Sequence, residues 1–145
     1  MKRLSLDDFH VKTSFQVLWG DMDAAQHVNN LIYLKWSETA RLLYFQEMGM
    51  DVSFGPGAPG PILGWQDCKY TFPVIYPDKV LGGVRTIEIL EDRFTLQCAL
   101  FSQRHQRLAA VSLQTIVPYD YGALKKVSMP EEWLAGIRGI EGVKD

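Results

Sequence analysis

The segment Asp21-Met-Asp-Ala-Ala-Gln-His-Val-Asn-Asn30 lies between a short strand-like run and a long helical one. Before it, Phe15-Gln-Val-Leu-Trp19 alternates loosely and places its apolar residues on one face of a strand. After it, neither Gly nor Pro occurs from Asn30 to Met48, and Gly49 follows where a helix commonly ends. The sequence therefore predicts a strand, a polar loop and a helix of about five turns that opens at the Asn pair.

The predicted helix is apolar on two sides. At about 100° per residue, its apolar side chains form one broad face and one narrower face. Such a helix is mostly buried. This indicates a central helix that is enclosed by a curved sheet and contacts a partner subunit. The broad face consists of Ile32, Tyr33, Trp36, Ala40, Leu43 and Tyr44, and the narrower face of Leu31, Leu34, Leu42 and Phe45.

The rest of the chain reads mainly as strands. Residues 51–61 are dense in Gly and Pro and are predicted to form a loop, and Pro130 is predicted to begin a short terminal helix. Strand-like runs lie near residues 62–75, 80–90, 94–103 and 108–117, with connections too short for parallel crossovers. The sequence thus predicts an α+β fold in a single domain over residues 1–145, in which a curved antiparallel sheet of about five strands wraps around one long helix.

The composition excludes several classes of protein. The hydrophobic fraction is 47%, the charged fraction is 22% and the formal net charge is −2, which argue for a folded chain that does not bind nucleic acid. No apolar run is long enough for stable membrane insertion, and the first residues lack the apolar stretch of a signal peptide, so the cytoplasm is expected. The two cysteines and three histidines show no metal-ligand spacing, so no metal is predicted.

Six polar residues crowd the loop between the first strand and the helix. One interpretation is structural, in which an Asn caps the helix, the histidine bonds a loop carbonyl and the aspartates favour the positive helix end. The other is catalytic, because free amides at a helix start polarise a carbonyl while a nearby carboxylate attacks it or activates water. The six are Asp21, Asp23, Gln26, His27, Asn29 and Asn30, and Asp23 is the candidate carboxylate.

Residues Trp19 to Tyr33, followed by Trp36 and the stretch Glu38-Thr-Ala-Arg41, closely resemble the hotdog thioesterases. The branch is the one that contains 4-hydroxybenzoyl-CoA thioesterase, bacterial acyl-CoA thioesterases and plant acyl-ACP thioesterases. The resemblance implies the hotdog fold and hydrolysis of an acyl-CoA or acyl-ACP thioester. It also implies no cofactor beyond the coenzyme A of the substrate.

The same resemblance assigns roles to the loop residues. It implies that Asp23 is the catalytic carboxylate, as nucleophile or general base, and that His27 and Asn29 belong to the catalytic site. Amides near Val28 to Asn30 are expected to polarise the thioester carbonyl. Ala25 departs from the plant enzymes, which have Asn at this position.

Two residues of the helix complete the predicted site. Tyr33 and Glu38 are expected to contact substrate together with Val28 and Asn30. Glu38 falls within the narrower apolar face, where a lone carboxylate is costly. A salt bridge is therefore the alternative role for Glu38, with Arg41 as a plausible partner.

Two other functions compete with hydrolysis. Hotdog enoyl-CoA hydratases pair an Asp and a His with four residues between them, whereas Asp23 and His27 have three residues between them. A non-catalytic acyl-binding domain would use Asp23 only to anchor the loop. In either case, an open antiparallel sheet leaves edges that need pairing, so a homodimer or homotetramer is expected.

Overall fold

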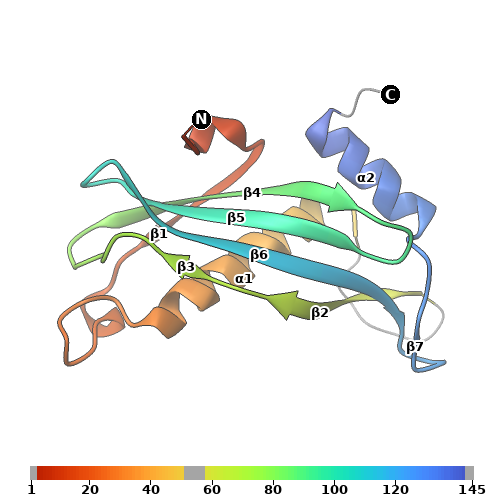
Figure 1. The fold of residues 1–145 in the computed structure, drawn as a ribbon, viewed down its shortest axis with the longest axis horizontal. Coiled ribbons are helices and arrows are strands. Elements are labelled where there is room, and N and C mark those ends of the chain that lie inside the picture. Colours follow the sequence, from red (N-terminus) through yellow and green to blue (C-terminus); the bar gives the residue numbers. More distant parts are fainter. Residues whose placement is uncertain (1–2, 51–57, 143–145) are drawn as a thin grey trace.

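The computed structural model describes residues 3–50 and 58–142, which form one curved antiparallel sheet with a long helix across it (Figure 1). Neither helix of this described chain has the length and apolarity needed to span a bilayer. The strands are β1 (Val11–Gln16), β2 (Gly60–Gln66), β3 (Lys69–Tyr70), β4 (Lys79–Ile89), β5 (Phe94–Ser102), β6 (Arg107–Asp120) and β7 (Lys125–Lys126). The helices are α1 (Asn30–Glu47) and α2 (Glu131–Glu141), with short 3-10 turns η1 (Leu6–Asp8) and η2 (Trp19–Asp21).

Helix α1 begins and ends almost where the sequence predicts. Asn29 caps it, with its side-chain Oδ1 accepting a hydrogen bond from Leu31 N at 3.0 Å. At the other end, Met48 forms the C-cap and Gly49 takes a positive φ of 81°, a conformation that glycine adopts without steric cost. The predicted helix is therefore confirmed, and its N-terminus is fixed at the polar loop.

The broad face of α1 is mostly buried, whereas the narrower face is exposed at two of its four residues. Tyr33, Trp36 and Tyr44 pack into the core, whereas Leu31 is 63% and Leu42 is 43% exposed. The prediction that both faces are buried is therefore wrong at Leu31 and Leu42 but holds at Phe45, which is 3% exposed. The reason is that α1 packs mainly on β1, β4 and β5, so the broad face makes most of its contact with the sheet.

The strand order is β1-β4-β5-β6-β2, and every pairing is antiparallel. Strands β4, β5 and β6 form an antiparallel meander, whereas β2 pairs with β6 because β1 occupies the other edge of β4. The predicted first strand at 15–19 is shifted, since β1 covers Val11–Gln16 and Trp19 lies in the turn η2. The predicted strand at 62–75 divides into β2 and β3, which both pair with β6.

The five strands on the main path confirm the curved sheet of about five strands. In β5, the alternate residues Phe94, Leu96, Cys98 and Leu100 are all buried, as expected for one face of a strand that packs against the core. The predicted loop at 51–61 lies largely outside the described residues, and its last two residues, Gly60 and Pro61, begin β2.

Helix α2 is fastened to the end of α1 by a buried contact and a hydrogen-bond network. The Tyr44 hydroxyl donates to Glu141 Oε2 at 2.7 Å, and Thr86 N donates to the same oxygen at 3.0 Å. Gly136 lies so close to Met48 that a Cβ at this position would overlap the Met48 carbonyl. Only glycine fits at this crossing without moving one of the helices.

We expect Gly136→Ala to lower the free energy of unfolding by about 1 to 3 kcal/mol, because backbone must move to accept the methyl group. Gly139 lies in the same helix with open space around the position of a Cβ, so it provides the matched control. There, alanine should raise the free energy of unfolding by about 0.5 to 1 kcal/mol through helix propensity alone. Urea unfolding of the two variants measures both effects, and equal values would contradict the close helix crossing.

Candidate functional site

Asp21 holds the polar loop in place from both ends. Its Oδ2 accepts a hydrogen bond from Leu18 N at 2.8 Å, and its carbonyl accepts one from Asn29 N at 2.9 Å. Met22 and Val28 also form an isolated antiparallel bridge. Asp21 therefore ties the exit of β1 to the cap of α1.

Asp23 closes a tight turn and presents its carboxylate to solvent. Asp23 N donates to His27 O at 3.1 Å, and Gln26 N donates to Asp23 O at 2.9 Å. Its Oδ1 accepts from Ala25 N at 2.9 Å, whereas Oδ2 has no hydrogen-bond partner among the residues described. Gln26 adopts a positive φ of 62° to make this turn, a strained conformation for a residue other than glycine.

The helix start offers one free amide. Val28 N donates to Val74 O at 2.9 Å, Asn29 N is used by Asp21, and Leu31 N is used by the Asn29 side chain. Within the described part of the chain, Asn30 N has no acceptor, and it lies at the positive end of α1. The set of amides expected between Val28 and Asn30 is thus reduced to Asn30.

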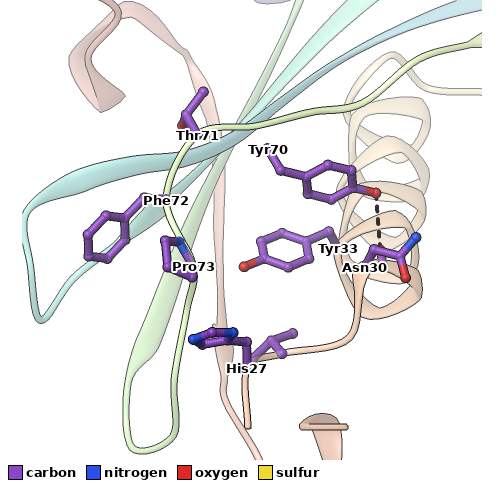
Figure 2. Close-up of a pocket in the computed structure, with 8 residues that line it drawn as sticks. His27, Asn30, Tyr33, Tyr70, Thr71, Phe72 and Pro73 are labelled. Carbon is purple, nitrogen blue, oxygen red and sulfur yellow. Dashed lines mark hydrogen bonds between the residues drawn. The ribbon is translucent and has the colours of Figure 1, made fainter. Parts of the chain in front are cut away.

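Two cavities flank the polar loop. We call the first the helix-start cavity; its volume is about 370 Å³ (Figure 2). We call the second the Asp23 cavity; its volume is about 470 Å³. The helix-start cavity is lined by His27, Val28, Asn30, Tyr33, Tyr70, Thr71, Phe72 and Pro73, and the Asp23 cavity by Trp19, Met22, Asp23, Gln26, Ile75 and Tyr76.

These cavities bring together some of the residues predicted for the site and separate others. His27, Val28, Asn30 and Tyr33 line the helix-start cavity, whereas Asp23 lines the neighbouring one. Asn29 lines neither of these two cavities, because its side chain caps α1. The polar loop therefore borders both cavities, with Asp23 on one and Asn30 on the other.

Two tyrosines form the far wall of the helix-start cavity (Figure 2). The buried hydroxyl of Tyr33 accepts a hydrogen bond from Val74 N at 3.0 Å, and burial raises the pKa of Tyr33. Tyr70 packs edge-on against Tyr33, with ring centroids 5.2 Å apart, and donates to Asn30 O at 3.3 Å. Burial, aided by Cys68, raises the pKa of Tyr70 to about 12, so its hydroxyl stays protonated at neutral pH.

Glu38 is not buried, contrary to the prediction. Its side chain is 61% exposed and lies 3.7 Å from Arg41, which confirms the expected pairing. It lies on the exposed face of α1 and lines neither cavity of the polar loop. Arg41 is the more buried partner, and it donates to Gln114 Oε1 at 3.1 Å. Desolvation lowers the pKa of Arg41.

Comparison with known proteins identifies the family. The thioesterase-like superfamily matches residues 17–137, a range that contains the polar loop, α1 and β2 to β6. This chain is a member of that superfamily. No curated protein sequence matches the chain. The expected relationship to the hotdog thioesterases is therefore confirmed.

Solved structures similar to this superfamily member share its fold over most of their length. A Thermus thermophilus thioesterase complexed with coenzyme A and Zn is 26% identical, with a TM-score of 0.82, over 95% of this chain and 99% of that one. A putative thioesterase from Pseudomonas aeruginosa is 25% identical, with a TM-score of 0.79, over 89% and 98%. A 1,4-dihydroxy-2-naphthoyl-CoA thioesterase from Synechocystis, at 18% identity and a TM-score of 0.77 over 88% and 94%, is similar in fold alone.

The described residues of this superfamily member contain no group of three His, Cys, Asp or Glu side chains able to hold a metal ion. The sequence also did not identify Tyr70, Thr71, Phe72 and Pro73 as cavity residues. They lie about 40 residues beyond Asn30 in the sequence, and contacts distant in sequence, such as the pairing of β3 with β6, bring them to the helix start.

We expect Asn29→Ala to lower the free energy of unfolding by about 1 kcal/mol, because it removes the cap of α1. Asn29→Ser keeps a capping oxygen and should restore most of that loss. Thermal unfolding compares the three proteins. If the two variants are equally destabilised, the side chain of Asn29 does not act through the cap.

Proposed function

We propose that this protein hydrolyses the thioester of a fatty or aromatic acyl group carried by coenzyme A, or by acyl-carrier protein, to a free acid and a thiol. The observation that carries the proposal is the position of Asp23 and Asn30 on one short loop that borders two neighbouring cavities. A carboxylate with a free oxygen lies seven positions before the free amide at the start of a buried helix. This arrangement supplies a proton acceptor or nucleophile and an electrophilic contact from one short segment.

In this proposal the thioester carbonyl oxygen accepts a hydrogen bond from Asn30 N. Negative charge develops on that oxygen during attack, and the positive end of α1 stabilises it. Because the charge is larger in the transition state than in the substrate, this contact accelerates the reaction instead of only tightening binding.

Asp23 acts by one of two routes. As a general base it takes a proton from water while the water oxygen bonds to the carbonyl carbon, and the C–S bond then breaks to release the thiol. As a nucleophile it bonds to the carbonyl carbon and expels the thiolate, and water then cleaves the resulting anhydride. His27, Val28, Asn30 and Tyr33 contact the substrate from the helix-start cavity.

Coenzyme A is the favoured carrier. The Thermus thermophilus relative, at 26% identity, was solved with coenzyme A bound.

We propose that the protein is cytoplasmic. Both cysteines are free, which is usual for a protein in that compartment.

We also propose that two copies of the chain pair, and that the site lies beside their interface. Strand β2 ends the sheet path, so its outer edge is unpaired among the described strands. Apolar side chains are exposed along this edge and along the neighbouring face of α1. They are Leu31, Leu42, Leu63, Trp65 and Tyr70, and Tyr70 also lines the helix-start cavity.

We expect purified protein to release thiol from at least one member of a panel of short, medium, long and aromatic acyl-CoAs. Asp23→Asn should lower kcat by about 10²- to 10⁴-fold, the usual contribution of a positioned acid–base group. Asp21→Asn, which keeps an oxygen to accept from Leu18 N, is the matched control and should retain most of the activity.

The same panel separates the competing functions. Binding of acyl-CoA without turnover by the wild-type protein would identify an acyl-binding domain. Addition of water to an enoyl-CoA, without release of thiol, would identify a hydratase. An Asp23→Asn variant as active as wild type would rule out the mechanism.

Sedimentation equilibrium tests the pairing of chains. We expect a particle mass of at least twice the 16.5 kDa of one chain, because the edge of β2 and the exposed apolar face of α1 need a partner. A mass of one chain at micromolar concentration would contradict the proposed assembly.

A further inference from the structure

Positively charged side chains of the turn between β5 and β6 lie beside the wall of the helix-start cavity. The guanidinium carbon of Arg107 lies 4.8 Å from the ring centroid of Phe72, a cation–π contact. The ring of His105 packs against the same phenyl group, with the two ring centroids 5.0 Å apart. Phe72 lines the cavity on the side that faces this hairpin (Figure 2).

A third hollow shares the lining residue Thr71 with the helix-start cavity. We call it the outer groove; its volume is about 780 Å³. Arg3, Gln103 and Arg107 give the groove polar walls, while Leu81 and Phe101 contribute apolar surface. The combination of arginines with apolar surface suits a ligand that is partly aromatic and partly anionic.

The charge of the turn is not neutralised by neighbouring acids. Asp78 is the nearest buried carboxylate, at 6% exposure, and its oxygens accept from the Ser102 hydroxyl and from the backbone amides of Lys79 and Arg104. Among the residues described, neither Arg104 nor Arg107 forms a salt bridge. Asp78 therefore fixes the shape of the turn, and neither guanidinium group is paired with a carboxylate in the described part of the chain.

We propose that the outer groove binds the nucleotide half of coenzyme A, with its phosphates on Arg107 and Arg3 and its adenine on the apolar surface. The pantetheine arm then passes Thr71 into the helix-start cavity, where the thioester meets Asn30. This inference rests on the proposed function, because it assigns a carrier to the same site. An Arg guanidinium binds a phosphate through two parallel hydrogen bonds, which gives the groove specificity for the nucleotide.

Two substrates with the same acyl group test the proposal, one carried by coenzyme A and one by pantetheine, which lacks the nucleotide. We expect Arg107→Gln to raise the ratio of the KM for acyl-CoA to the KM for acyl-pantetheine by about tenfold or more, the usual loss for a hydrogen bond to a charged group. Arg107→Lys keeps the charge and should recover part of the loss.

Arg104→Gln is the matched control. It removes the same charge from the same turn, but Arg104 does not line the outer groove and instead donates to Pro77 O at 3.3 Å. At physiological ionic strength, screening within about 8 Å limits its effect on a phosphate in the groove. The KM ratio of this variant should stay near the wild-type value.

Calorimetry with adenosine 3′,5′-bisphosphate tests the groove without any turnover. Binding to wild type and to Arg104→Gln, with a loss of about tenfold or more in Arg107→Gln, would support the subsite even if no thioester were hydrolysed. In that case the proposed thioesterase activity would be contradicted, whereas the proposed nucleotide site would be supported.

Three results would overturn the subsite and leave hydrolysis intact. The first is a KM ratio in Arg107→Gln equal to that of the wild type. The second is an equal loss of activity toward both substrates, which would indicate that Arg107 has a structural role through its contact with Phe72. The third is slower hydrolysis of acyl-carrier-protein substrates by both Arg107→Gln and Arg104→Gln, while hydrolysis of acyl-CoA is unaffected. That result would assign the turn to an acidic protein surface instead of a nucleotide.

Discussion

The backbone of Val74 is the point on which the site depends. Its carbonyl accepts a hydrogen bond from Val28 N at 2.9 Å, and its amide donates to the Tyr33 hydroxyl at 3.0 Å. Val74 is fully buried, so water cannot replace either bond, and each unsatisfied group would cost about 1 to 3 kcal/mol. The polar loop, the first turn of α1 and the segment before β4 are therefore held in one arrangement.

Val74 is one of three acceptors that leave a single amide free at the helix start. Val28, Asn29 and Leu31 all donate to protein acceptors, so the loop is closed around Asn30. In the same loop, Gln26 has a positive φ of 62° and the Asp23 side chain is exposed. Under the proposed mechanism, this fixed amide would be oriented before a thioester binds, which is the condition for electrostatic stabilisation of the developing charge.

The local features of the fold could be predicted because their causes are local. The cap at Asn29, the glycine at the end of α1 and the alternation in β5 are each set by a few neighbouring residues. The position of β2 beside β6 could not be predicted, since periodicity identifies a strand but not its partner. The same limit applies to Tyr70, which joins the site only through strand pairing. Glu38 was misplaced because a helical wheel shows which faces are apolar, and not which of them meets the sheet.

The segment from Tyr70 to Val74 serves the site in three ways at once. Tyr70 and Phe72 wall the helix-start cavity, Val74 fixes the loop, and Thr71 lies where that cavity meets the outer groove. The segment is itself held by the sheet, because Thr71 N donates to Ala109 O at 2.8 Å and the Thr71 hydroxyl donates to Leu108 O at 2.6 Å. A ligand that spans both hollows would therefore bind along a backbone already fixed by β6. Little conformational entropy would be lost on binding, and the arginine at the start of β6 would keep a constant distance from the helix start.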